Sequence, residues 1–81
     1  MTVNGIKLTR GQSDVYAVFK EYGVALPDHA LVPLAQHAMK VNQSSSSIRS
    51  RRHELAELGL VTHVSDTVCR SGRKAGVWKA R

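Results

Sequence analysis

Hydrophobic residues recur at helical spacing in three segments of the chain, and the first segment follows Thr9. Thr9 and Gln12 have the spacing of a capping box, in which two side chains satisfy free amides at the start of a helix. Gly23 is the residue type that most often ends a helix in the left-handed conformation. The pattern therefore predicts a helix over residues 10–22. Its apolar stripe is formed by Val15, Val18, Phe19 and Tyr22.

The second helical pattern follows an extended link and contains a proline. Asp28 is a residue type that caps helices well, and apolar residues then recur at helical spacing over residues 29–39. Pro33 lies inside this pattern, where it lacks an amide hydrogen and its ring clashes with the preceding turn. The sequence leaves two alternatives open: a bent helix over residues 29–39, or a regular helix that begins at Pro33.

The third helical pattern begins within four consecutive serines. Composition alone suggests a flexible linker, but serine is among the best N-cap residues and a helical pattern follows at once. We therefore expect Ser44 to cap the helix and Gly59 to end it, which predicts a helix over residues 45–58. Its buried stripe is formed by Ile48, Leu55 and Leu58.

After the third helix the pattern changes to the alternation typical of β-strands. Residues 60–65 and 77–80 form two such segments, and a basic loop joins them. This order predicts a β-hairpin with a long tip. The segment Val3–Leu8 is either a frayed start or a short edge strand. The expected fold class is α+β, with three helices followed by a two-stranded hairpin over residues 60–80.

The chain is short, and its size limits the functions that it can perform. Its 81 residues have room for one hydrophobic core, so residues 1–81 are expected to form a single domain. A deep enzyme cleft does not fit such a domain. The sequence also contains no glycine-rich phosphate loop and no carboxylate pair placed for acid–base catalysis. Neither catalysis nor a cofactor is therefore expected.

The cysteine and histidine content argues against a disulfide and against a metal site. The chain contains one cysteine, which fits a reducing, cytoplasmic setting. The four histidines and Cys69 lack the close paired spacing of zinc ligands. The longest apolar run, residues 30–35, is far shorter than the ~20 residues that span a bilayer, and the start of the chain does not have the pattern of a signal peptide.

The charge of the chain is concentrated in its second half. The net charge is +6. Residues 1–48 contain four Lys and Arg against three Asp and Glu, whereas residues 49–81 contain eight against three. A basic half beside a nearly neutral half indicates a face that meets a polyanion. Nucleic acid is the first candidate and an anionic membrane surface the second, while a generally basic protein surface is the simplest alternative.

Two stretches of the sequence resemble the small winged helix-turn-helix proteins of phages and actinobacteria. In Gln43–Val61 a serine-led helix carries an Arg-x-Arg-Arg run and ends in Gly-Leu-Val. In Ser71–Ala80 a Ser-Gly-Arg turn precedes a last strand that bears Trp78. The resemblance implies that the third helix lies in the major groove of double-stranded DNA and that the hairpin, the wing, contacts the backbone or the adjacent minor groove. We interpret the chain as a sequence-specific binder of double-stranded DNA that acts as a small transcriptional regulator of phage or bacterial origin.

Helical geometry sorts the polar residues of the third helix. The side opposite Ile48 carries serines, which can pair with several bases, and Arg49, which can donate two hydrogen bonds to guanine. Arg51 is nearer the buried stripe, where it either lays its stem on the core or pairs with Glu54. The residues expected in the major groove are Ser45, Ser46, Arg49, Ser50 and His53. The residues expected to neutralise phosphates are Arg52, Arg70, Arg73 and Lys74.

Several alternatives stay open beside this interpretation. The basic residues of the helix could form a solvated face, and the basic loop could be disordered until DNA orders it. Trp78 is expected to pack on the core rather than to stack on a base. The chain could also be a DNA-bending recombination accessory factor of the excisionase type, or a winged helix that docks on a host protein. Tight sequence selectivity would require a homodimer or a second protein, because one small module offers a limited interface.

Overall fold

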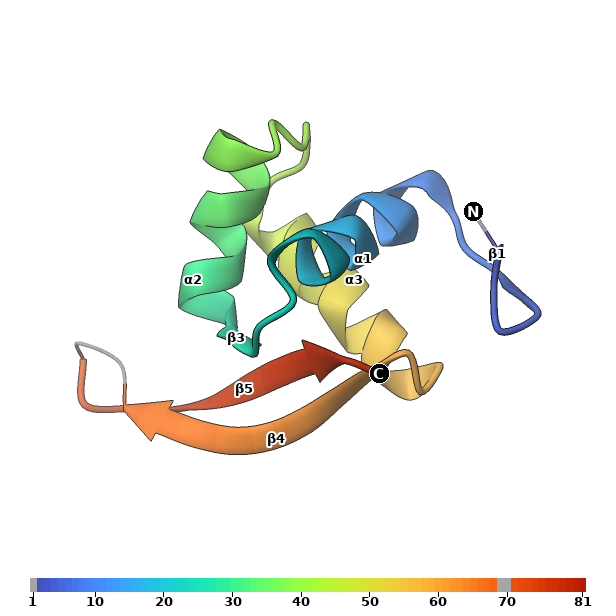
Figure 1. Cartoon of the computed structure of the whole chain (residues 1–81). Helices are drawn as coiled ribbons and strands as arrows, with labels where there is room; N and C mark the ends of the chain where they lie inside the picture. Colours follow the sequence, from blue (N-terminus) through green and yellow to red (C-terminus); the bar gives the residue numbers. More distant parts are fainter. Residues whose placement is uncertain (1, 69–70) are drawn as a thin grey trace.

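The structure is a computed structural model that describes residues 2–68 and 71–81. Three helical segments pack together over a sheet, and a long hairpin extends from the sheet to one side, away from a short N-terminal hairpin (Figure 1). The α+β class is confirmed. The elements are β1 (Thr2–Val3), β2 (Ile6–Lys7), α1 (Arg10–Tyr22), β3 (Leu26–Pro27), α2 (Asp28–Pro33), the π-helix η1 (Leu34–Ala38), α3 (Ser45–Glu57), β4 (Val61–Val68) and β5 (Lys74–Ala80).

Helix α1 has the bounds and the caps that the sequence predicts. The Thr9 hydroxyl accepts a hydrogen bond from the Gln12 amide, and the Thr9 amide donates to the Gln12 side chain. At the other end, Gly23 has a φ of 63°, and its amide donates to the carbonyl of Phe19. A left-handed residue costs little at a glycine, which lacks the Cβ that makes this conformation unfavourable.

The second helical segment is an α-helix through Pro33 and a π-helix after it. The chain is helical from Asp28 and continues through Pro33, but η1 then has π-type hydrogen bonds, such as that from the Met39 amide to the Leu34 carbonyl. The missing amide and the ring of a proline affect the turn before it, which here is α2, whereas the π-type hydrogen bonds lie in the turn after it. Asp28 is not the N-cap that we expected. Pro27 occupies that position, and Asp28 makes no capping hydrogen bond.

Helix α3 begins where the sequence predicts and ends one residue earlier. The Ser44 hydroxyl accepts a hydrogen bond from the Ser47 amide at 3.2 Å, so the serine run is a helix start and not a linker. The helix ends at Glu57. Leu58 consequently lies in the following turn and is 38% exposed, whereas we expected it in the buried stripe.

The sheet differs from the predicted two-stranded hairpin in two ways. Strand β3 pairs with β5, which gives the order β3-β5-β4 in three strands. Strands β4 and β5 are also longer than predicted, and pairing continues out to Val68 and Lys74. Lys, Ala and Gly are weak strand formers, so the sequence of residues 74–76 indicates a loop, but backbone pairing with β4 holds them in a strand. A bulge at Val64 shifts the register between His63 and Ser65.

The hydrophobic core lies where the helices meet the inner end of the long hairpin. It draws side chains from every helix and from β3 and β4. Trp78 is half-buried and packs against this core, as we expected. Within residues 2–68 and 71–81, no helix has both the length and the apolar character needed to cross a membrane. The largest fully buried side chains are Phe19, Leu31, Ile48, Leu55, Leu60, Val15, Val18 and Val61.

Candidate nucleic-acid interface

The outward face of α3 brings together four of the five residues expected in the major groove. Ile48 and Leu55 are fully buried, and they turn the opposite side of the helix toward solvent. Within the described residues, Arg49 has no hydrogen-bonding or ion-pair partner. Ser45, the first residue of the helix, is half-buried and lies to one side of this face. The exposed residues of the face are Ser46, Arg49, Ser50 and His53.

Arg52 occupies the edge of α3 that faces α2 and the long hairpin. Its Nε and Nη2 donate to the two carboxylate oxygens of Asp28, each at 2.9 Å. Its guanidinium carbon lies 4.4 Å from the ring centroid of Trp78. Only 14% of the Arg52 side chain is exposed. The guanidinium therefore joins α2, α3 and β5, and these are different partners from the phosphate that the sequence led us to expect.

The contacts of Arg52 continue into the hairpin through Trp78. The ring of His63 meets the ring of Trp78 edge to face, with centroids 5.2 Å apart. His63 Nε2 lies 2.8 Å from Asp66 Oδ1, because the bulge at Val64 turns these two side chains toward the same side of β4. The base of the hairpin is thus fixed to the helices by a chain of polar and aromatic contacts.

The other edge of α3 faces the start of α1. Glu54 accepts hydrogen bonds from Gln12 Nε2 at 2.9 Å and from Arg51 Nη2 at 2.8 Å. These two bonds, that from Gln12 foremost, hold the pKa of Glu54 below its ordinary value. The pairing of Arg51 with Glu54 is one of the two alternatives that the sequence offered. The charge of Arg51 is therefore balanced within the protein.

The exposed charge of α3 changes sign along the helix. Its first half presents Arg49, whereas its second half presents Glu57, whose side chain is 68% exposed. His53 Nε2 lies 2.9 Å from Glu57 Oε1, and both side chains are well exposed to solvent. Because the Glu57 carboxylate repels a phosphate, a polyanion approaches α3 most favourably at its N-terminal half.

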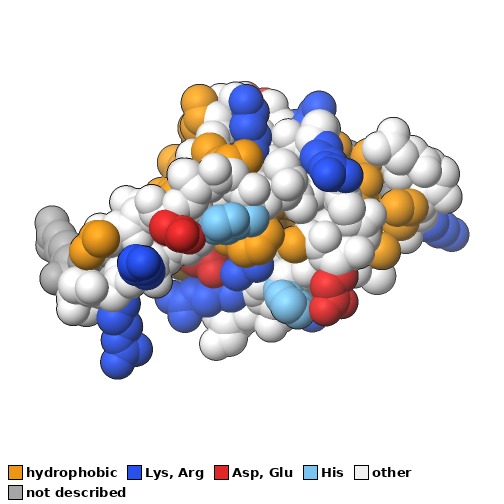
Figure 2. All heavy atoms as spheres, turned by 90° about the horizontal axis from the view of Figure 1, so that it is seen from below, with side chains coloured by type: hydrophobic (Ala, Val, Ile, Leu, Met, Phe, Trp, Pro, Cys, Tyr) orange, Lys and Arg blue, Asp and Glu red, His pale blue; other side chains and the backbone are white. Residues whose placement is uncertain are grey.

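The outer part of the β4–β5 hairpin, residues 62–76, forms an arm with little burial. None of its described residues is buried. Figure 2 shows Lys and Arg side chains that project from the arm next to the residues drawn in grey. Arg73 and Lys74 are both exposed at this end of the molecule. Arg70, which we also expected to contact phosphate, and Cys69 lie outside the described residues.

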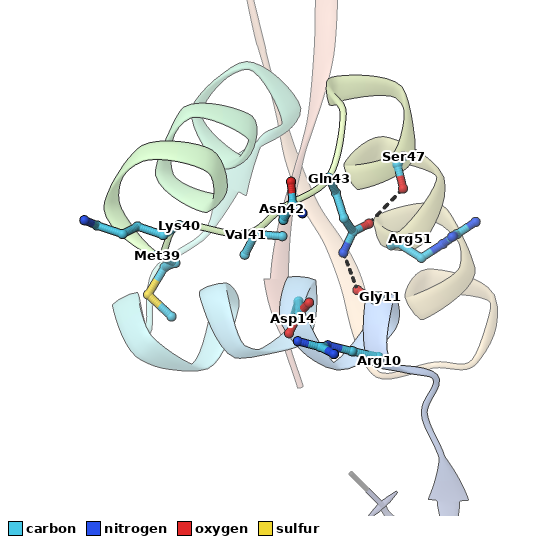
Figure 3. Close-up of a pocket in the computed structure, with 10 residues that line it drawn as sticks. All are labelled: Arg10, Gly11, Asp14, Met39, Lys40, Val41, Asn42, Gln43, Ser47 and Arg51. Carbon is cyan, nitrogen blue, oxygen red and sulfur yellow. Dashed lines mark hydrogen bonds between the residues drawn. The ribbon is translucent and has the colours of Figure 1, made fainter.

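A hollow of about 560 Å³ lies on the α1 side of α3, where the start of α1 meets the turn that precedes α3. Gln43 holds this turn in place (Figure 3): its Nε2 donates to the Gly11 carbonyl at 3.2 Å, and its Oε1 accepts from the Ser47 hydroxyl at 2.8 Å. Arg10 and Lys40 also line the hollow. They belong to segments far apart in the sequence, so their positions along the chain do not predict that they lie in one site.

The signals that could have identified these two cations are weak. Arg10 directly follows the predicted cap Thr9, and Lys40 directly follows the helical pattern of residues 29–39, so both lie at the ends of predicted elements. What the sequence did not supply was the packing of α1 against α3, which brings the two ends together.

Comparisons with models of protein families, with curated proteins and with solved structures find no match to this chain.

Proposed function

We propose that the chain is a winged helix-turn-helix protein that binds double-stranded DNA, and that it acts as a small transcriptional regulator of the kind found in phages and bacteria. In this proposal α3 is the recognition helix and the arm is the wing. Ser46, Arg49, Ser50 and His53 meet base edges in the major groove. Arg73 and Lys74 neutralise phosphates beside it.

One observation carries the proposal: an exposed arginine, with no partner among the described residues, lies beside Ser46 and Ser50 on the outward face of the N-terminal half of α3. An arginine whose guanidinium is paired inside the protein would lose those bonds on binding DNA. Arg49 has no such partner within residues 2–68 and 71–81, so its five N–H donors are available to guanine or phosphate. Arg52, which is tied to Asp28 and Trp78, serves instead to hold the recognition helix against α2 and the hairpin.

The order of the elements supports the same proposal. Helix α2 with η1, a turn and then α3 form a helix-turn-helix sequence, and the two long strands follow at once. Strand β3 lies between α1 and α2 in the chain and pairs with β5, which anchors the base of the hairpin. The arm beyond this anchor carries exposed cations and little buried surface, as a segment that contacts DNA requires.

The test is a fluorescence-anisotropy titration with mixed-sequence duplex DNA at several salt concentrations. If about four to six phosphates are contacted, the logarithm of the binding constant falls with the logarithm of the salt concentration at a slope of about −4 to −5. Arg49→Gln should weaken binding to a preferred site by roughly 5- to 150-fold, the effect of one good base contact. Lys74→Gln should weaken all duplexes alike and reduce the slope by about 1.

A matched control is Arg81→Gln, which removes an exposed arginine beside the last turn of α1, away from the outward face of α3. It should bind as the wild type does. If the wild-type protein binds no duplex even at low salt, the proposal is wrong, and the basic face becomes a candidate docking surface for an acidic host protein. Strong bending of a bound duplex, with cooperative coating, would instead assign the protein to the excisionase-type accessory factors.

A further inference from the structure

We infer that the hollow beside α3 is a second phosphate contact, in which Arg10 and Lys40 hold the DNA backbone on the flank of the recognition helix opposite the wing. The inference rests on the proposed function and extends it, because it assigns residues of α1 and of the turn to the DNA interface. The protein would then contact both phosphate backbones that border the major groove. The arm would contact one backbone, and the hollow would contact the other.

A helix that lies in the major groove has room for a phosphate backbone on each flank. An α-helix with its side chains is about 10–12 Å wide and the major groove is about 12 Å wide, so a helix in the groove has a phosphate backbone along each flank. One flank of α3 faces α2 and the hairpin through Arg52. The other flank faces α1, and there the hollow adjoins Ser47, the residue next to the outward-facing Ser46. A helix that presents Ser46 to base edges therefore brings the hollow up to a backbone.

The charged residues that line the hollow favour an anion there. Arg10, Lys40 and Arg51 line it together with a single acid, Asp14. Arg51 is paired with Glu54, so Arg10 and Lys40 against Asp14 leave the hollow with a net positive charge. Farther along the same flank, Arg51 and Glu54 form a pair with no net charge, which makes the hollow the favourable place on this flank for a phosphate.

The directions of the Arg10 and Lys40 side chains favour a DNA backbone over a small anion as the ligand. In Figure 3 the side chain of Lys40 points away from the hollow at its rim, and that of Arg10 runs from the first turn of α1 along the helix toward Asp14. A site built for a small anion would direct its cations to one point inside. Cations that stand around an open rim suit a polymer of phosphates that runs past them.

The experiment measures duplex affinity and its salt dependence for Arg10→Gln and for Lys40→Gln. Each variant should bind all duplexes more weakly and should reduce the salt slope by about 0.9, which corresponds to about eightfold at 0.1 M salt for one lost phosphate contact. Preference among sequences should not change, because a phosphate contact carries no sequence information. Lys20→Gln, in the last turn of the same helix, is the matched control and should bind as the wild type does.

A substitution that strengthens binding excludes misfolding as the cause. Asp14 lies in the hollow and repels a phosphate there, so Asp14→Asn should tighten duplex binding about two- to threefold at low salt. Its control is Glu21→Gln, an exposed acid near the other end of α1, which should have no effect.

The outcomes separate this inference from the function on which it rests. If the wild type binds DNA and Arg49→Gln weakens that binding, but the variants at Arg10, Lys40 and Asp14 behave like their controls, the second contact is wrong and the proposed function stands. If the wild type binds no duplex, both are wrong. Weaker binding at Arg10 and Lys40 with tighter binding at Asp14→Asn supports the inference.

Discussion

The helical bundle and the hairpin arm differ in how far their side chains are buried. In the bundle, Arg52 pairs with Asp28 across two helices, and apolar side chains such as Phe19 and Ile48 are fully buried. In the arm, residues 62–76, none of the described side chains is buried, and Val68 is 66% exposed. Arg52 and Trp78 lie at the junction of the two regions.

This contrast explains how so small a domain can present charge without losing stability. A chain of this length buries a limited share of its surface, so its stability depends on the few side chains of the bundle. The arm contributes little to that burial. Exposed cations in the arm therefore cost the domain little stability. Substitutions should accordingly divide into those that unfold the protein and those that change only what it binds.

The largest expected effect is in the bundle. Leu55 is fully buried, so Leu55→Ala should lower the free energy of unfolding by about 2–5 kcal/mol, through lost burial and the cavity that remains. Val68→Ala in the arm should change it by less than about 0.5 kcal/mol. Urea denaturation followed by circular dichroism measures both. Similar losses at the two positions would mean that the arm is part of the cooperative core.

The junction between the two regions should show the next largest effect. Arg52→Ala leaves Asp28 without its two donors and removes the contact on Trp78, which should cost about 1.5–3 kcal/mol of unfolding free energy. Arg49→Ala, three residues away and exposed, should leave stability unchanged. A cycle that combines Arg52→Ala with Asp28→Ala measures the coupling. Additive losses would show that the pair contributes nothing beyond its separate residues.

Helix capping provides a smaller test within one serine run. Ser44→Ala removes the hydroxyl that accepts the Ser47 amide and should cost about 1 kcal/mol. Ser46→Ala is the matched control: it lies on the exposed face of the same helix turn, so stability should not fall, whereas duplex binding should weaken. Equal stability losses from the two substitutions would contradict the capping role of Ser44.

The smallest effect concerns pH. The lowered pKa of Glu54 means that the folded state holds the ionised carboxylate better than the unfolded chain does. The resulting stabilisation is complete above the ordinary glutamate pKa of 4.5, and it is lost as the pH falls through the lower folded pKa. Glu54→Gln lacks this dependence, so the stability difference between wild type and variant should shrink on acidification. Parallel stability curves through the acid range would show that the hydrogen bonds from Gln12 and Arg51 do not favour the charged form.

Local sequence signals were sufficient wherever a short-range interaction decides the structure. The capping box at Thr9, the left-handed Gly23 and the cap at Ser44 each depend on contacts within a few residues, so the bounds of α1 and the start of α3 could be predicted. The periodicity of apolar residues likewise predicted the buried side of α3, and with it the outward position of Arg49.

Long-range pairing decided the rest. Residues 74–76 have weak strand propensity and become a strand only because β4 lies beside them, and β3 exists because β5 is there to pair with it. Asp28 could not be assigned to Arg52, nor Arg10 to the same hollow as Lys40, since 24 and 30 residues separate the partners and their meeting depends on how the helices pack. The sequence by itself determined the bounds of α1, the start of α3 and which side of α3 is exposed, because these follow from local contacts and from periodicity. Only the tertiary structure decided which arginines are already paired and which remain available to a partner.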